Sequence, residues 1–149
     1  MADNNQTKMP QWSSQSGIRA TPGQLEAVAM RCREELHASL RRMGTGSTAT
    51  LRENILDVRV EHSLAPAEHN LMRRAAGRDF FQHYIEELAE QMHPAFQHHV
   101  ESILPCSVTY IRVKVDCDDD CIVFTFGLRP RPTWRERLMA DQENRTSYA

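Results

Sequence analysis

The chain has 149 residues, of which 40% are hydrophobic and 26% charged, and its formal net charge is -2. A chain of this length and composition predicts one soluble domain that needs neither disulfides nor a metal to fold. The sequence contains no apolar run near the length of a membrane span and no secretory signal at its start. We therefore expect a cytoplasmic protein without membrane insertion.

Composition divides the chain into three parts. Residues 1–20 are rich in Asn, Gln and Ser and predict a disordered leader. Residues 21–128 are acidic overall and carry the periodic apolar patterns of a single α+β domain, whereas residues 129–149 form a polar tail that could contain a short helix. An acidic body between mildly basic ends differs from the concentrated basic stripe of most nucleic-acid-binding proteins.

The first half of the domain predicts one helix followed by two strands. Thr21-Pro22 is a typical helix start, and apolar residues then recur at steps of three and four up to the glycines at 44 and 46. Residues 48–52 predict a first strand. Residues 55–62 alternate apolar and polar side chains, which is typical of a half-buried antiparallel strand.

The second half predicts a short helix, a long helix and two further strands. The short helix covers about 65–75 with Ser63 as its N-cap, and the long helix covers 79–104 with a kink at Pro94. Strands are expected at 107–115 and 121–128. The order αββ-ααββ predicts an α+β two-layer sandwich, in which one long and one or two shorter helices cover one face of a four-stranded antiparallel sheet.

Two short motifs, within this order of elements, carry a resemblance to a known family. They are Glu35-Leu36-His37 in the first helix, with a Gly-containing loop at 43–46, and Leu64-Ala65-Pro66-Ala67-Glu68 after the second strand. Over roughly residues 22–128 the chain resembles the bacterial MpsC-like family. Ala65 replaces that family's Thr, and Leu104-Pro105-Cys106 replaces its usual Thr-Gly.

The resemblance implies association with a sodium-linked, membrane-potential-generating system related to inorganic-carbon uptake, and a partner at or near the membrane. No active site comes with the resemblance. The chain itself has no Walker loop, no G-x-S-x-G and no H-E-x-x-H. We therefore expect no enzyme, no catalytic residues and no cofactor.

Two groups of residues are weak metal-binding candidates. Cys117 and Cys121 flank three aspartates, so they could face each other as ligands of a soft metal or as a redox-labile bridge, although an inert solvated turn is the favoured interpretation. His83, Glu90 and His93 follow helical spacing, and Glu90-x-x-His93 matches a spacing used in di-iron bundles. A polar stripe facing solvent is the alternative interpretation.

The long helix also suggests how the chain acts. At about 39 Å it exceeds what a small sheet covers, so we expect a homodimer whose interface follows the helix. The expected interface residues are Phe81, Tyr84, Leu88, Met92 and Phe96. The leading hypothesis is a non-enzymatic accessory or regulatory domain acting through protein–protein contacts.

Two other functions remain as alternatives to this hypothesis. One is a dimer that senses a small ligand or a metal. The other is a nucleic-acid-binding module that uses a basic sheet face. The residues expected on that face are Arg52, Arg59, Tyr110, Arg112 and Lys114.

Overall fold

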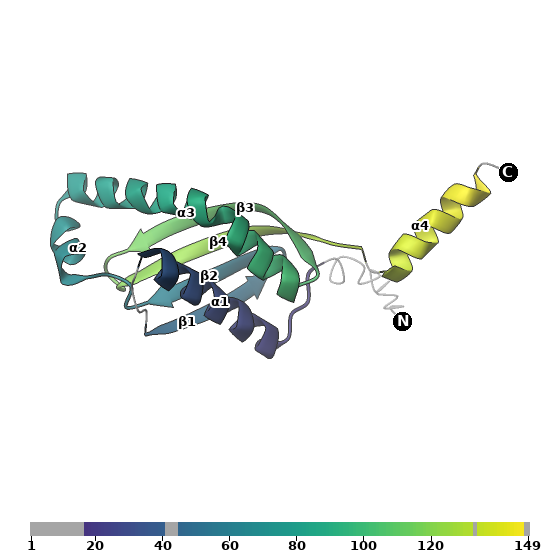
Figure 1. Ribbon diagram of the computed structural model, residues 1–149, viewed down its shortest axis with the longest axis horizontal. Coiled ribbons are helices and arrows are strands. Elements are labelled where there is room, and N and C mark those ends of the chain that lie inside the picture. The colour runs from purple at the N-terminus through teal and green to yellow at the C-terminus, as the bar shows by residue number, and fades with distance from the viewer. Residues whose placement is uncertain (1–16, 41–44, 133, 148–149) are drawn as a thin grey trace, which may run out of the picture.

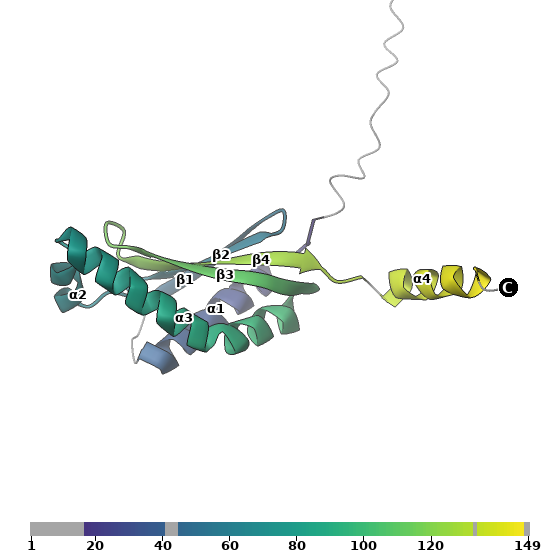
Figure 2. The ribbon, with the colours of Figure 1, turned by 90° about the horizontal axis from the view of Figure 1, so that it is seen from above.

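The computed structural model describes residues 17–40, 45–132 and 134–147 and confirms the predicted α+β fold. The helices are α1 (Pro22–Leu40), α2 (Pro66–Leu71), α3 (Ala75–Ile103) and α4 (Trp134–Thr146). The strands are β1 (Gly46–Arg52), β2 (Ile55–Glu61), β3 (Cys106–Asp116) and β4 (Cys121–Pro130). They form one antiparallel sheet in the order β1-β2-β4-β3, with α1 and α3 on the same face (Figures 1 and 2).

The two halves of the domain repeat one αββ plan around the centre of the sheet. In each half a helix precedes a hairpin, and the second strand of each hairpin, β2 or β4, lies at the centre. These central strands pair antiparallel with Val58 opposite Phe124. The halves are therefore related by an approximate twofold axis, which leaves β1 and β3 as the two edges of the sheet.

The core lies between the inner face of the sheet and the two long helices. The alternation predicted for the central strands is confirmed, since Leu56, Val58 and Val60 on β2 are all buried. On α3, Phe96 packs against Phe124 and Phe126 of β4, with ring centroids 4.8 and 6.1 Å apart. Such tilted and edge-to-face aromatic contacts add to the free energy gained from burial alone.

Reciprocal hydrogen bonds begin α1 as its sequence predicts. The Thr21 hydroxyl accepts from the Gln24 backbone N–H at 3.1 Å, and the Gln24 side chain accepts from the Thr21 N–H at 2.9 Å. At α2 the prediction is wrong, because the N-cap is Ala65 and not Ser63. The Ser63 hydroxyl instead donates to the Val60 carbonyl at 2.6 Å, so it closes the end of β2.

Pro94 lies inside α3, and the helix changes direction part-way along its length (Figures 1 and 2). Proline has no N–H, so the carbonyl of Glu90 loses its helical donor, and the proline ring crowds the preceding turn. The kink keeps one side of this 29-residue helix against the curved sheet, with buried residues from Gly77 to Val100.

This packing corrects the predicted dimer interface. Phe81, Met92 and Phe96 are only 3%, 5% and 0% exposed, so they belong to the core of the chain itself and cannot face a partner. Leu88 is half-buried against the same core, whereas Tyr84 remains 45% exposed. The dimer itself stays a prediction, but Phe81, Met92 and Phe96 cannot form its contact.

The ends of the domain differ from each other. Residues 1–16 of the predicted leader lie outside the described residues, whereas Ile18 is buried and its N–H donates to the Asn54 side chain at 3.4 Å. Residues 17–20 therefore belong to the domain. At the other end α4 extends away from the sheet and contacts no other described element (Figures 1 and 2). None of the helices described here combines the length and apolarity that crossing a bilayer requires.

Phe96→Ala is expected to lower the free energy of unfolding by about 3–5 kcal/mol, because it removes a fully buried ring and leaves a cavity. Met30→Ala is the control, since Met30 is 44% exposed on α1 and should cost less than about 1 kcal/mol. Urea denaturation followed by circular dichroism measures both. Equal midpoints for the two variants would contradict this description of the core.

Candidate functional site

One polar stripe of α3 follows the free edge of β3. Its members recur at steps of three and four, so they share one side of the helix. We call this set the edge stripe, and it consists of Gln82, Glu86, Glu90, His93, Gln97 and Glu101. Both ends of the stripe are bound to the backbone of β3, whereas its middle lines a groove.

At the N-terminal end of the edge stripe, Gln82 pairs with β3 as a neighbouring strand would. Its side-chain amide donates to the Val113 carbonyl at 2.8 Å and accepts from the Val115 N–H at 2.9 Å. The same amide donates to Glu86 at 2.9 Å. Because backbone groups of an edge strand otherwise lack partners, one glutamine here satisfies two of them.

Glu101 holds the other end of the same edge. Its carboxylate accepts from the Val108 N–H at 2.9 Å and from the Gln97 side chain at 3.2 Å. A β-bulge between Val108 and Tyr110 lies at this point and shifts the register of β3 against β4. The bulge turns the Val108 N–H outward, where Glu101 accepts it.

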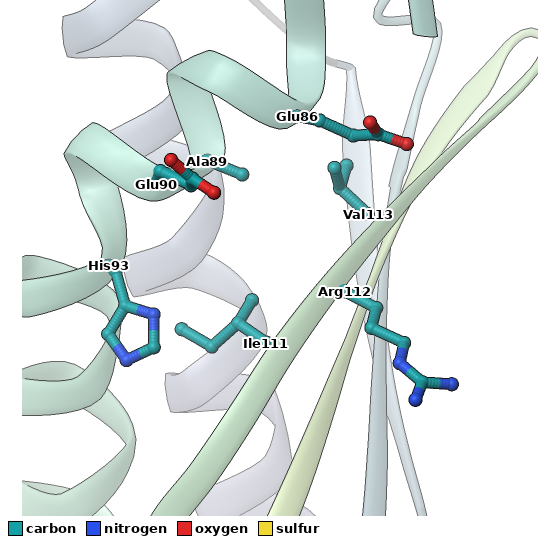
Figure 3. Close-up of a pocket in the computed structure, with 7 residues that line it drawn as sticks. All are labelled: Glu86, Ala89, Glu90, His93, Ile111, Arg112 and Val113. Carbon is teal, nitrogen blue, oxygen red and sulfur yellow. The ribbon is translucent and has the colours of Figure 1, made fainter. Parts of the chain in front are cut away.

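Between these two clamps lies a groove of about 330 Å³ (Figure 3). Its helix side is formed by Glu86, Ala89, Glu90 and His93, and its strand side by Ile111, Arg112 and Val113. Ile111 and Val113 point toward α3, whereas the Arg112 side chain leaves on the opposite side of the strand. The groove therefore has an apolar floor and a polar wall, and it ends where Gln82 and Glu101 reach the strand.

The wall of the groove is acidic. Glu86 and Glu90 are exposed and His93 is half-buried. Arg112 does not neutralise them from within the groove, because its guanidinium lies over the Tyr110 ring at 5.0 Å on the other face of the sheet. A ligand that enters the groove thus meets carboxylates on one side and backbone on the other.

The structure separates the histidine and glutamate metal candidates. His83 is 75% exposed and lies 3.8 Å from Glu86 and from Glu87, on the solvent side of α3. Glu90 and His93 instead line the groove. Within the part of the chain that the structure describes, no three His, Cys, Asp or Glu side chains are arranged to hold a metal ion.

The two cysteine candidates are not paired with each other in the sheet register. Cys121 opposes Asp116 and Glu61 on its neighbouring strands, and Cys117 belongs to the turn beyond. Both are free thiols, Cys117 partly exposed and Cys121 buried. Arg59 reaches over this end of the sheet to Asp119 at 3.2 Å.

Burial raises the pKa of the three buried thiols, which are those of Cys32, Cys106 and Cys121. Burial, with help from Glu35, raises the pKa of Cys32 to about 12, and burial raises the pKa of Cys106 to about 11 against the opposing effect of Arg131. Burial likewise raises the pKa of Cys121, although Arg59 acts in the opposite direction. These three thiols are therefore poor nucleophiles near neutral pH.

The outer face of the sheet carries the predicted basic residues among acidic ones. Arg52, Arg59 and Asp57 border a shallow hollow with Thr48, Thr50 and Val123. Tyr110 lies over Gly127, where an added Cβ would come 2.0 Å from the ring, so any larger residue there would displace the ring. The Asp57 carboxylate accepts from the Thr125 hydroxyl at 2.7 Å, which leaves this face mixed in charge.

Exposed apolar side chains gather where α2 meets the start of α3. We call this group the corner patch and define it as Leu71, Ala76, Phe80 and Tyr84. Leu71 and Ala76 line a hollow with Gly77, and Phe80 stands one turn further along α3. Phe80 is 66% exposed and Tyr84 45% exposed. Gly77 lets the helices approach, because a Cβ there would lie 1.8 Å from the Leu71 carbonyl oxygen.

Sequence reasoning missed this patch, although the adjacent pair Phe80-Phe81 contains its signal. Neighbouring residues on a helix point about 100° apart, so both rings cannot enter one core. Phe81 is buried, which leaves Phe80 in solvent.

Together the fold and the groove define the class: a two-layer α+β domain of two αββ units with a partly open sheet edge. The chain belongs to the MpsC family, whose model, described as Na+-translocating membrane potential-generating system (MpsC), matches residues 26–129. Comparisons with curated proteins and with solved structures gave no match.

Gln82→Ala is expected to expose the edge of β3, because the Val115 N–H loses its acceptor. The backbone amide of Val115 should then exchange with solvent at least about tenfold faster than in the wild type. Hydrogen exchange followed by NMR measures this, with Gln91→Ala as the control, since Gln91 is exposed on the same helix. Unchanged protection of Val115 would contradict the clamp.

Thiol labelling with a disulfide reagent at pH 8 is expected to modify one cysteine quickly and three slowly. The fast one is Cys117, which is partly exposed, and Cys117→Ser should remove the fast phase. Raising the pH to 10 should leave Cys32 and Cys106 slow, because their raised pKa values keep them protonated. In 8 M urea, about the concentration that unfolds most domains, all four should react at one rate. A fast phase that persists in Cys117→Ser would contradict this order.

Proposed function

We propose that the chain is a non-enzymatic accessory protein of a sodium-linked, membrane-potential-generating system. In this proposal it acts as a cytoplasmic homodimer through protein–protein contacts. Membership of the MpsC family supports the link to a sodium-linked system. The exposed corner patch supports action through protein–protein contacts. An aromatic side chain that is 66% exposed beside a hollow is the kind of anchor on which protein interfaces depend.

Burying the corner patch would contribute a useful free energy of association. A buried aromatic side chain removes on the order of 150–250 Å² of surface from water. Covering the exposed part of Phe80 would therefore contribute about 2–3 kcal/mol to the free energy of association per copy. In an isologous dimer the same patch is used twice. Tyr84 extends the apolar surface by one helical turn and brings a hydroxyl to its border.

The charges beside the patch favour a second copy as the partner. Arg73 and Arg74 are exposed in the segment between α2 and α3, and Asp79 is exposed beside Phe80 in the sequence. Because residues of both signs adjoin the patch, a twofold axis through it can pair a basic residue of one copy with an acidic residue of the other. A surface that binds a second copy of itself needs both positive and negative charges around it, and the corner patch has both.

Light scattering coupled to size-exclusion chromatography tests the dimer at micromolar concentration. We expect twice the mass of the chain for the wild type and a monomer for the double variant Phe80→Ser, Tyr84→Ser, whose dissociation constant should rise roughly a hundredfold or more. The matched control is Met30→Ser, which changes an exposed apolar side chain on α1. A monomeric wild type, or a dimer in the double variant, would refute this interface.

The physiological part of the proposal is tested in cells that lack this chain. Their sodium-dependent membrane potential, followed with a voltage-sensitive dye, is expected to fall and to recover with the wild-type chain. The double variant at Phe80 and Tyr84 should not restore it, whereas Met30→Ser should. Full recovery with the double variant would separate the activity from the corner patch.

A further inference from the structure

We infer that the groove between α3 and β3 binds an extended, basic peptide segment of a partner protein, which pairs with β3 as an added strand. The inference goes beyond the proposed dimer, because it concerns another surface and a different partner. It rests on the proposed function only in taking that partner to be a protein.

The backbone of β3 supplies the first argument. The Val113 carbonyl and the Val115 N–H both point away from β4, since both are bound by Gln82. Alternate residues of an antiparallel strand point their backbone groups to the same side, so Ile111 also presents its N–H and carbonyl outward. Among the described residues no hydrogen bond to these two groups of Ile111 is formed.

The two clamps mark the limits of this open stretch. Glu101 holds the N–H of Val108, and Gln82 holds the carbonyl of Val113. The strand between them spans about 17 Å at 3.3–3.4 Å per residue, which suits four or five residues of an extended chain. Exposed edges usually carry such protections along their length. Here the protection is interrupted where the groove lies.

Charge decides the nature of the added segment. Glu86 and Glu90 line the groove from the helix side and are exposed. In strand addition the backbone provides affinity and alternate side chains provide selection. The side chains that point toward α3 would meet these carboxylates, so Lys or Arg at those positions is favoured and Asp or Glu is repelled.

The same charges disfavour a second copy at this edge. Antiparallel pairing of two β3 strands about a twofold axis keeps both α3 helices on one face of the joined sheet. It would bring two edge stripes together, each with Glu86 and Glu90. Like charges face each other in that arrangement, whereas a basic segment gains from the same carboxylates.

Three dye-labelled pentapeptides test the inference with the full chain. The first is acetyl-Lys-Val-Lys-Val-Lys-amide, the second replaces each Lys by Glu, and the third keeps Lys but methylates the backbone nitrogens of alternate residues. Fluorescence polarisation at low salt should detect the first peptide. Methylation should weaken it at least about fivefold by removing strand hydrogen bonds, and the Glu peptide should not bind.

Protein variants place the peptide in the groove. Glu90→Lys is expected to weaken binding of the Lys peptide about three- to tenfold. Glu87→Lys is the matched control, because Glu87 has the same charge on the same helix but pairs with His83 outside the groove. NMR should show the Ile111 amide protected from exchange when the Lys peptide is bound.

Several outcomes would overturn the inference. They are no binding of the Lys peptide, equal binding of its methylated form, equal loss in Glu90→Lys and Glu87→Lys, or an Ile111 amide that stays unprotected. Dissociation of a dimer by the peptide would assign the edge to a second copy and also refute it. Failure of the proposed dimer appears separately, as a monomeric wild type in light scattering without peptide.

Discussion

The packing of α3 across the sheet is the constraint on which the rest of the structure depends. One side of this helix enters the core through Phe81, Ile85 and Phe96, all of which are buried. Because the core fixes the rotation of α3, it also fixes the position of the neighbouring side of the helix. That side is the edge stripe, and it lies along the edge of β3. Gln82 and Glu101 then satisfy backbone groups that would otherwise be open at the edge. The kink at Pro94 lies between them and belongs to the same fit.

The motifs that carry the family resemblance contribute to the stability of this arrangement. Leu36 lies in the core, and Glu35 beside it meets His99 of α3 at 3.1 Å, which joins the two long helices. In the second motif the Ala65 N–H donates to the buried Glu68 side chain at 2.6 Å, and the Leu64 N–H donates to Asp120 at 3.1 Å. The first contact joins α1 to α3, the second caps the start of α2, and the third joins that start to the β3–β4 turn, so both motifs have a structural role.

Local patterns predicted most of this fold but only part of its surfaces. The periods of two and 3.6 residues locate the strands and helices, since each follows from geometry within the element. The periodicity of α3 alone does not show whether an apolar ring meets its own sheet or a partner. Periodicity therefore predicts Phe81 and Phe96 at an interface, whereas both lie in the core. In the same way, the spacing of Glu90 and His93 predicts only that both lie on one polar side of the helix. That this side forms one wall of a groove depends on where β3 runs, which the spacing does not show.

The length of α3 explains how one helix holds the edge of β3 at two points. This helix has 29 residues, and Gln82 near its start and Glu101 near its end both bind backbone groups of β3. The polar residues between them line the groove and leave the strand open there. A single long helix thus both protects this edge of the sheet and forms one wall of the candidate site. In this arrangement the core sets the position of α3, and the position of α3 sets which backbone groups of β3 a partner can reach.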